Sequence, residues 1–182
     1  MKRFLIIFFL STIPLIANTD SISGKLQKII CQTYHNCDQY TDEQILEISK
    51  LLDKASMIYQ VSIYKLFALI AIESGFDRYH SYKNTNGSVD IGLMQSNSDH
   101  IPERCKKLLN RNCDYSELID PVISVKFAFY RFNECAKYKN DAFFVCYNNE
   151  YLAYKYLTTD YYPEYLTKLY VEYNVIVKEL LK

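Results

Sequence analysis

Apolar residues recur at intervals of three and four along most of the chain, which is the spacing of one face of an α-helix. Two start signals support this pattern. Thr41 and Gln44 have the spacing of a capping box, and Asp120-Pro121 supplies an N-cap followed by proline at the first helical position. The predicted fold class is therefore all-α. The predicted helices begin after Thr41, span residues 62–74, 120–138 and 141–147, and begin again near Pro163.

The segment after the second of these helices is polar and irregular over residues 76–91. Asn86-Gly87, a dipeptide typical of hairpin turns, lies inside this loop rather than between two alternating apolar runs, so the pattern gives no hairpin signal. Residues 92–95 follow the loop, and we expect them to begin another short helix.

One carboxylate stands at the end of the most apolar predicted helix. Glu73 shares a face with Leu66, Leu69 and Ile70, and Gly75 is placed to end the helix. The negative end of the helix dipole and the apolar surroundings both disfavour an ionised carboxylate. The pattern is typical of an acid that keeps its proton near neutral pH, as glycoside cleavage requires. From its position alone, an equally good interpretation is a glutamate that extends into solvent from a frayed helix end.

The beginning of the chain has the arrangement of a secretory signal. Lys2 and Arg3 precede a short apolar segment that continues to the small residue Ala17. The alternative, an uncleaved anchor, is disfavoured because this segment is interrupted and falls short of the roughly 20 residues that span a bilayer. We therefore predict a signal peptide over residues 1–17, a single domain over 18–182, and export to the periplasm or cell envelope.

Six cysteines follow the signal, and none forms a C-x-x-C pair, so no metal site is indicated. An even number of cysteines in an exported chain predicts disulfides. Six cysteines allow about fifteen pairings, and we favour three local ones because each pair falls within one short connection. These are Cys31 with Cys37, Cys105 with Cys113, and Cys135 with Cys146.

Charge gives little support to a nucleic-acid ligand. Removing Lys2 and Arg3 from the 21 basic residues leaves 19 against 21 acidic ones, and no basic stripe is present. We expect a monomer that does not bind nucleic acid.

Three short segments, taken in order, add a resemblance to a known family. Residues 71–77 (Ala-Ile-Glu-Ser-Gly-Phe-Asp), 92–95 (Gly-Leu-Met-Gln) and Tyr147-Asn148 resemble the signature segments of the lytic transglycosylase domain related to goose-type lysozyme. The run over residues 84–97 is most similar to small exported members that are often associated with secretion systems, conjugation machinery or pili. The resemblance covers about residues 55–150.

The resemblance implies a lysozyme-like helical fold with a substrate cleft between two lobes, and peptidoglycan glycan strands as the partner. It implies that Glu73 protonates the glycosidic oxygen between N-acetylmuramic acid and N-acetylglucosamine. The same carboxylate then takes a proton from the C6 hydroxyl of the muramic sugar, which attacks its own anomeric carbon to give a 1,6-anhydro product. A second carboxylate, which most glycosidases need, is then unnecessary. No cofactor or metal is implied.

The resemblance also implies substrate-binding roles for seven other residues. Ser74 would orient Glu73, while Gly92 and Leu93 would let the backbone approach the sugar. Met94 and Gln95 would line the cleft, although core packing is an equal alternative for Met94. Tyr147 would place its hydroxyl near the Glu73 carboxylate, and Asn148 would hold the loop or the glycan.

Two positions depart from the family pattern. Asn149-Glu150 stands where a small residue and glycine are usual, and Arg78 replaces a common proline. Two other functions stay open, and the altered Asn149-Glu150 segment motivates the second of them. One is a hydrolytic muramidase in which Asp77 or Asp90 positions water, and the other is a non-catalytic peptidoglycan-binding assembly factor of a secretion or pilus complex.

Overall fold

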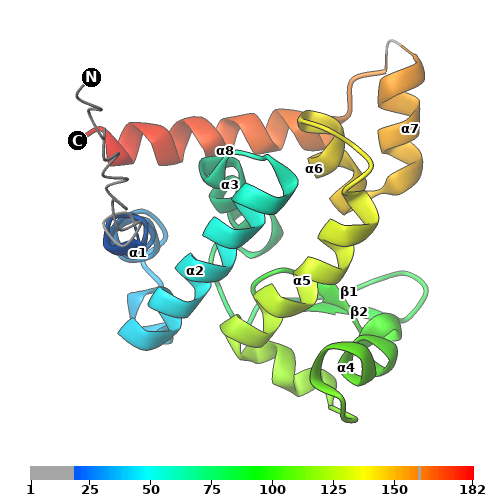
Figure 1. Ribbon diagram of the computed structural model, residues 1–182, viewed down its shortest axis with the longest axis horizontal. Coiled ribbons are helices and arrows are strands. Elements are labelled where there is room, and N and C mark those ends of the chain that lie inside the picture. Colours follow the sequence, from blue (N-terminus) through cyan, green and yellow to red (C-terminus); the bar gives the residue numbers. More distant parts are fainter. Residues whose placement is uncertain (1–18, 160) are drawn as a thin grey trace, which may run out of the picture.

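The computed structural model describes residues 19–159 and 161–182, so the predicted signal peptide over 1–17 lies outside the described residues. Helices dominate the chain, and α8 runs along one side of the molecule while α7 stands at its end (Figure 1). The helices are α1 (Thr19–Lys28), α2 (Asp42–Tyr59), α3 (Ile63–Ser74), α4 (Ile101–Leu109), α5 (Pro121–Cys135), α6 (Asp141–Asn148), α7 (Glu150–Thr158) and α8 (Glu164–Leu180).

The start and stop signals in the sequence act as predicted. The Gln44 backbone N–H donates to Thr41 Oγ1 at 3.2 Å, and the Thr41 N–H donates to Gln44 Oε1 at 3.1 Å, which completes a capping box at α2. Asp120 accepts hydrogen bonds from two N–H groups in the first turn of α5. Gly75 ends α3 with φ 60°, a left-handed conformation that glycine adopts without strain. Helix α5 ends at Cys135, three residues before the predicted boundary.

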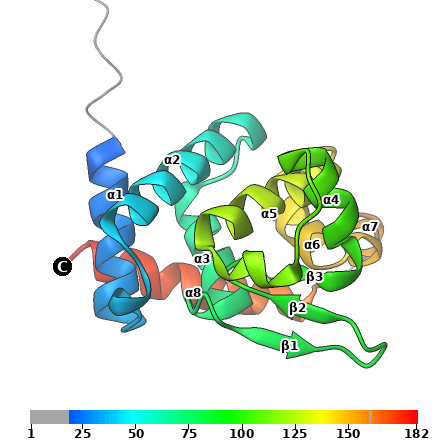
Figure 2. The same cartoon turned by 90° about the horizontal axis from the view of Figure 1, so that it is seen from below.

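A small antiparallel sheet corrects the expectation for residues 76–97. Strands β1 (Ser81–Lys83) and β2 (Val89–Ile91) form a hairpin, and β2 also pairs with β3 (Ser96–Asn97). Asn86-Gly87 lies in the hairpin loop, and residues 92–95 form a turn rather than a helix. The strands are two or three residues long and β1 is fully exposed, so no alternating apolar pattern marked them. Figure 2 shows this sheet at one edge of the molecule.

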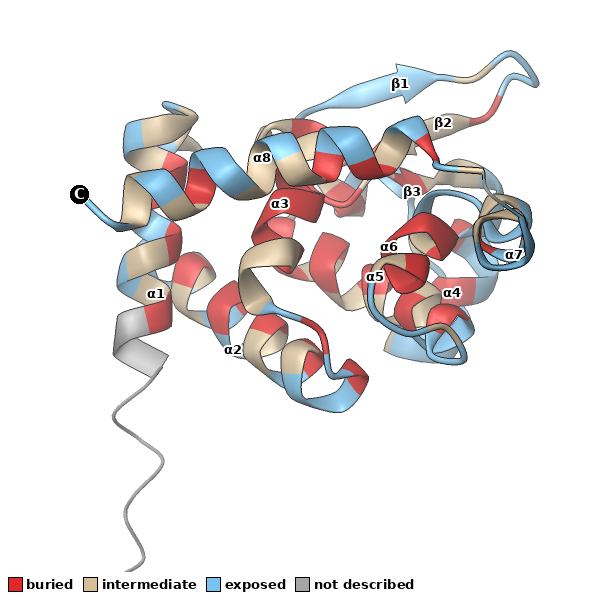
Figure 3. Ribbon diagram, turned by 90° about the horizontal axis from the view of Figure 1, so that it is seen from above, coloured by how far each residue is buried: buried red, intermediate tan, exposed pale blue. Residues whose placement is uncertain are grey.

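Two hydrophobic clusters divide the molecule into two lobes. The larger cluster surrounds α3, which is buried under α8 (Figure 3). The smaller cluster lies between β2, α4 and the 3₁₀ turn Tyr115–Ile119. Helix α5 contributes to both, because Phe132 is buried in the larger cluster and Phe127 in the smaller one. The helical, two-lobed architecture predicted from the resemblance is thus present, with the small sheet as an addition.

All three predicted disulfides are present. Cys31 is bonded to Cys37, Cys105 to Cys113, and Cys135 to Cys146. The first closes the turn after α1, the second attaches α4 to the loop behind it, and the third joins the end of α5 to α6. Within the described residues, no single helix is long and apolar enough to cross a membrane, and the pair that passes together, α2 with α3, is bent by 118°.

Candidate active site

A cleft of about 850 Å³ opens between the two lobes, with Glu73 at its wall. The lining is mainly polar, which suits a ligand rich in hydroxyl and amide groups. One side comes from the end of α3 and from α6, another from the hairpin and β3, and the third from α4 and α5. The lining residues are Glu73, Asn84, Thr85, Asn86, Ser88, Asp90, Gln95, Ser96, Asn97, His100, Glu103, Arg104, Tyr130, Arg131, Glu134, Tyr147 and Asn148.

Glu73 has the electrostatic setting that its sequence position suggested. Burial raises the pKa of its carboxyl group from 4.5 to about 7, and the negative charge of Asp90 acts in the same direction. A hydrogen bond from the Tyr165 hydroxyl to Glu73 Oε1, 2.6 Å long, opposes this rise by favouring the ionised form. The carboxyl group can therefore exist in either protonation state near neutral pH, as a group that gives and then takes a proton requires.

The hydroxyl bonded to Glu73 belongs to Tyr165 of α8, whereas the sequence had suggested Tyr147. Tyr147 donates instead to the Met94 carbonyl oxygen at 2.8 Å. Its ring still lies close enough to Glu73 for the carboxylate charge to raise the pKa of Tyr147, together with burial, which is the larger cause. Tyr165 lies 92 residues from Glu73 in the sequence and has no motif around it. The apolar spacing of the last helix predicted a buried face, but it did not indicate that this face packs on α3.

The turn at residues 92–94 supports the cleft from behind. Gly92 has φ 78°, and a Cβ atom there would meet the Leu118 carbonyl oxygen at 2.2 Å, so the close approach is to the protein's own backbone. Leu93 and Met94 are fully buried in the larger core, which decides for core packing at Met94. These three residues position the site without lining the cleft.

Ser74 attaches this turn to the end of α3 rather than bonding Glu73. Its hydroxyl donates to the Leu93 carbonyl oxygen at 2.8 Å, with the Ile70 carbonyl also within reach at 3.3 Å. From the other side, the Met94 N–H donates to Ser124 Oγ at 3.0 Å. The turn that precedes Gln95 is therefore held between α3 and α5.

Gln95 and Asn148 do line the cleft. The Gln95 amide nitrogen donates to the carbonyl oxygens of His80 and Gly92 at 3.0 and 2.9 Å. Both amide hydrogens are thereby used, which leaves the amide oxygen as the group that Gln95 offers to a ligand. An acetamido N–H or a hydroxyl is the partner that such an acceptor fits.

Asp90 is a second carboxylate in the cleft, and Asp77 is not part of it. The Asn97 amide donates to Asp90 Oδ1 at 2.7 Å and the Asn84 amide to Oδ2 at 2.9 Å. Asp77 instead accepts from the Tyr79 N–H at 3.0 Å within its own turn.

Comparison with known proteins identifies the family. The family model described as the transglycosylase SLT domain matches residues 50–174, more than half of the chain. The chain belongs to the SLT transglycosylase domain family. It is also 38% identical over 85 residues to Protein IpgF of Shigella sonnei, an alignment that covers 45% of this chain and 52% of that relative. The chain thus spans about half the length of the curated relative it matches. No solved structure matches the chain significantly.

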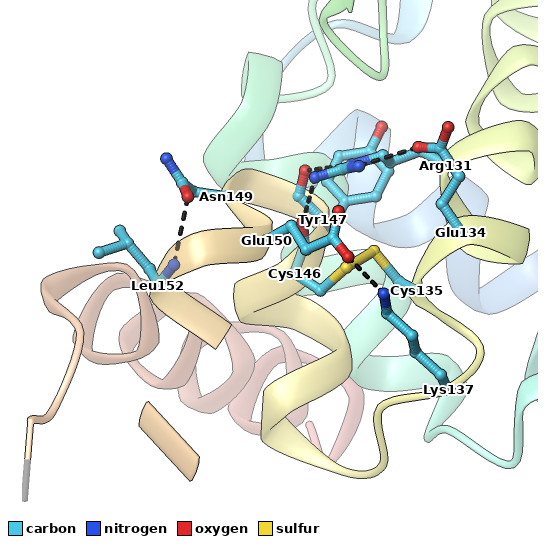
Figure 4. Close-up of a disulfide and its surroundings, with 9 residues drawn as sticks. All are labelled: Arg131, Glu134, Cys135, Lys137, Cys146, Tyr147, Asn149, Glu150 and Leu152. Atoms are coloured by element: carbon cyan, nitrogen blue, oxygen red, sulfur yellow. Dashed lines mark hydrogen bonds and ion pairs between the residues drawn. A yellow bond between two sulfur atoms is a disulfide. The ribbon is translucent and has the colours of Figure 1, made fainter. Parts of the chain in front are cut away.

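The segment that departs from the SLT pattern, Asn149-Glu150, lies beside Tyr147 and the Cys135–Cys146 disulfide (Figure 4). Asn149 is the N-cap of α7 and accepts from the Leu152 N–H at 3.2 Å, while Glu150 forms an ion pair with Lys137. Neither residue lines the cleft. Arg131 of α5 donates to the Tyr147 carbonyl at 3.2 Å and to the Cys146 carbonyl at 2.6 Å. These two hydrogen bonds hold the end of α6 against α5.

Arg78, which replaces the usual proline, ties the SLT domain together behind the site. Its guanidinium donates to the Ile119 carbonyl at 2.8 Å and to the Gln39 carbonyl at 2.9 Å. Across residues 19–159 and 161–182, no group of three or more His, Cys, Asp or Glu side chains is placed to hold a metal ion.

Proposed function

We propose that this chain is a peptidoglycan lytic transglycosylase that cleaves the bond between N-acetylmuramic acid and N-acetylglucosamine. The observation that carries the proposal is Glu73, a carboxyl group with a pKa of about 7 at the wall of a polar cleft of about 850 Å³. Membership of the SLT family supports the substrate class.

In the first step, protonated Glu73 gives its proton to the glycosidic oxygen, and the bond from that oxygen to the muramic C1 breaks. Glu73 is left as a carboxylate, which the Tyr165 hydroxyl stabilises through the hydrogen bond at 2.6 Å. Positive charge develops on the sugar ring in this step, and the carboxylates of Glu73 and Asp90 in the same cleft favour it electrostatically.

In the second step, the Glu73 carboxylate removes the proton of the muramic C6 hydroxyl as its oxygen bonds to C1. The products are a 1,6-anhydromuramyl end and an N-acetylglucosamine with a free C4 hydroxyl. Glu73 regains its proton, so the cycle consumes no water. The Gln95 amide oxygen accepts a hydrogen bond from an acetamido or hydroxyl group and holds the sugars in register.

The test is digestion of purified peptidoglycan by the mature protein and by Glu73→Gln, followed by mass spectrometry of the soluble muropeptides. We expect anhydro products from the wild type and none from the variant, because glutamine cannot give up a proton. A fully active Glu73→Gln protein would refute the assignment of Glu73. No product from either protein would favour the non-catalytic binding role.

Asp90 supports a second candidate, a hydrolytic muramidase. An acid with a raised pKa and a hydrogen-bonded carboxylate in one cleft is the pairing that hydrolytic glycosidases use. Asp90 would then act as the second carboxylate, as nucleophile or as base for a water molecule. The products separate the two reactions, because hydrolysis gives a reducing muramic end that is heavier by one water molecule than the anhydro end.

The proposed setting is the periplasm, where the enzyme opens the wall locally around an envelope-spanning secretion or pilus complex. Three disulfides suit an oxidising compartment. The resemblance of residues 84–97 to small exported members supports the link to such a complex. We propose that the protein acts there as a monomer and requires no cofactor.

A further inference from the structure

One arginine on the wall opposite Glu73 has a setting that neither the family resemblance nor the proposed reaction explains. Arg104 lies in α4, its side chain lines the cleft, and only 9% of the residue is exposed. The neighbouring Cys105 is bonded to Cys113 and buried in the smaller core, so the backbone that carries Arg104 is firmly held.

The other charged groups on this wall are already paired. Lys107 and Glu103 form an ion pair at 2.5 Å along α4, and Arg131 pairs with Glu134 at 2.8 Å along α5. Arg104 has neither a hydrogen-bond acceptor nor an ion-pair partner among residues 19–159 and 161–182, although its guanidinium lies over the Tyr130 ring at 5.3 Å. The charges of Glu134 and Arg131 also act on Arg104, in opposite directions, but these two residues form an ion pair with each other. Arg104 is therefore the arginine of this wall without an ion-pair partner among the described residues.

Within the described residues, Thr33 Oγ1 is the one buried side-chain nitrogen or oxygen without a hydrogen-bond partner, so the Arg104 nitrogens are open to the cleft. Their N–H donors have no acceptor in this part of the chain and are available to a ligand. Burial also lowers the pKa of Arg104. An anion that enters the cleft would accept hydrogen bonds from these donors and neutralise the charge. The flat guanidinium fork matches a carboxylate with two parallel hydrogen bonds, and the Tyr130 ring fixes its plane.

We propose that Arg104 forms a carboxylate-binding subsite that selects the anionic substituent of the muramic sugar. This proposal rests on the proposed function, because it takes peptidoglycan as the ligand. The carboxylates of peptidoglycan are borne by the lactyl group of muramic acid when no peptide is attached, and by the stem peptide when one is. Either would extend from the sugar toward the wall of the cleft.

The subsite adjoins the reacting bond. The Tyr147 side chain lies within the fields of both Glu73 and Arg104, since Glu73 raises its pKa while Arg104 lowers it, with burial the largest cause. Glu73, Tyr147 and Arg104 also line the same cleft, so a muramic sugar bound beside Glu73 would share that cleft with the Arg104 side chain. Arg104 would act on substrate affinity and register, while proton transfer remains with Glu73.

Binding is measured by calorimetry on the Glu73→Gln protein, so that no probe is cleaved. The probes are short glycan strands with intact stem peptides, strands stripped of peptides by an amidase, and both kinds after conversion of their carboxyl groups to carboxamides. Arg104→Met is compared with Lys106→Met, which removes an exposed cation from the same helix that does not line the cleft. Arg104→Lys retains the charge without the fork.

We expect Arg104→Met to weaken binding of the matching carboxylate probe roughly tenfold or more, the loss typical of a charge-assisted hydrogen bond to a buried group. Lys106→Met should bind as the parent protein does, and Arg104→Lys should fall between. Loss confined to peptide-bearing strands identifies the stem-peptide carboxylates, and loss confined to stripped strands identifies the lactyl carboxylate.

Equal binding of carboxylate and carboxamide probes by the parent protein would overturn the proposal, and this comparison requires no substitution at Arg104. An equal loss by Arg104→Met for every probe would also overturn it. Failure of the proposed reaction looks different, because the wild type would then release no product while charge-dependent binding persisted.

Discussion

The hydrogen bond from Tyr165 to Glu73 makes a quantitative prediction for Tyr165→Phe. The substitution removes one hydroxyl and keeps the ring, so α8 retains its packing on α3. The lost bond is 2.6 Å long and favours the ionised carboxylate. A hydrogen bond to a charged group contributes about 1.5–3 kcal/mol, which corresponds to roughly one to two pKa units. The pKa of Glu73 should therefore rise from about 7 by that amount.

The first step needs protonated Glu73, so activity falls as the pH rises through the pKa of this group. In Tyr165→Phe the alkaline limb of the pH–rate profile should move upward by one to two units, as that pKa shift requires. The plateau rate should also fall, because a weaker acid transfers its proton less readily. The assay is the initial rate of muropeptide release over a range of pH.

Tyr170→Phe is the matched control. Tyr170 also lies in α8, and its hydroxyl donates to Asp141 Oδ2 at 2.8 Å and accepts from Lys65 at 3.0 Å, away from the cleft. This variant should lose stability without moving the alkaline limb. A limb that stays in place or moves down in Tyr165→Phe would refute the role assigned to this hydrogen bond.

Three further predictions concern stability. Folding raises the pKa of Glu73 from 4.5 to about 7, so the native state loses stability as the pH rises through this interval. Glu73→Gln should therefore be more stable than the wild type at pH 8, by at most about 3 kcal/mol, and equally stable at pH 4. Thermal unfolding at the two pH values measures this difference. Gly92→Ala should cost about 2–5 kcal/mol from left-handed strain and overpacking against Leu118, whereas Gly87→Ala, with no atom within 4 Å of its Cβ, should cost only about 1–2 kcal/mol in denaturant titrations. Replacing Cys135 and Cys146 together by alanine should lower stability by about 3 kcal/mol. It should also reduce muropeptide release, because Cys146 directly precedes Tyr147, which lines the cleft. Replacing Cys31 and Cys37, which are not near a cleft-lining residue in the sequence, should lower stability alone.

Features with a local cause could be predicted from the sequence. The capping box at Thr41, the N-cap at Asp120 and the stop at Gly75 each depend on residues within a few positions. The raised pKa of Glu73 could be predicted for the same reason, since the apolar residues that bury it precede it in one helix. Disulfide pairing was predictable because each bridge closes a short connection.

Features that depend on distant segments could not be predicted in this way. Tyr165 reaches Glu73 only because α8 packs along α3, and no local pattern records that contact. The hairpin was missed because Asn84 and Asn97 hold it through Asp90, rather than an alternating apolar face. No pattern in the sequence indicated that Gly92 lies against the Leu118 carbonyl, a contact across the fold that leaves no room for a Cβ atom.

Helices α1, α4 and α7 were also missed. Helix α4 owes its place to the small second core and to the Cys105–Cys113 bridge, and α7 follows an N-cap, Asn149, at a position where the family pattern suggested a loop. Tertiary packing and a single capping residue stabilise these helices. The apolar pattern within each covers too few residues to predict a helix from the sequence.

The central claim is that Glu73 uses the muramic C6 hydroxyl, and not water, to complete the cleavage. The most direct measurement is digestion of purified peptidoglycan in water enriched with heavy oxygen, followed by mass spectrometry of the released ends. The account predicts 1,6-anhydromuramyl ends that carry no heavy oxygen, and no release by Glu73→Gln. Reducing muramic ends labelled with heavy oxygen would contradict it and assign Asp90 to a hydrolytic reaction.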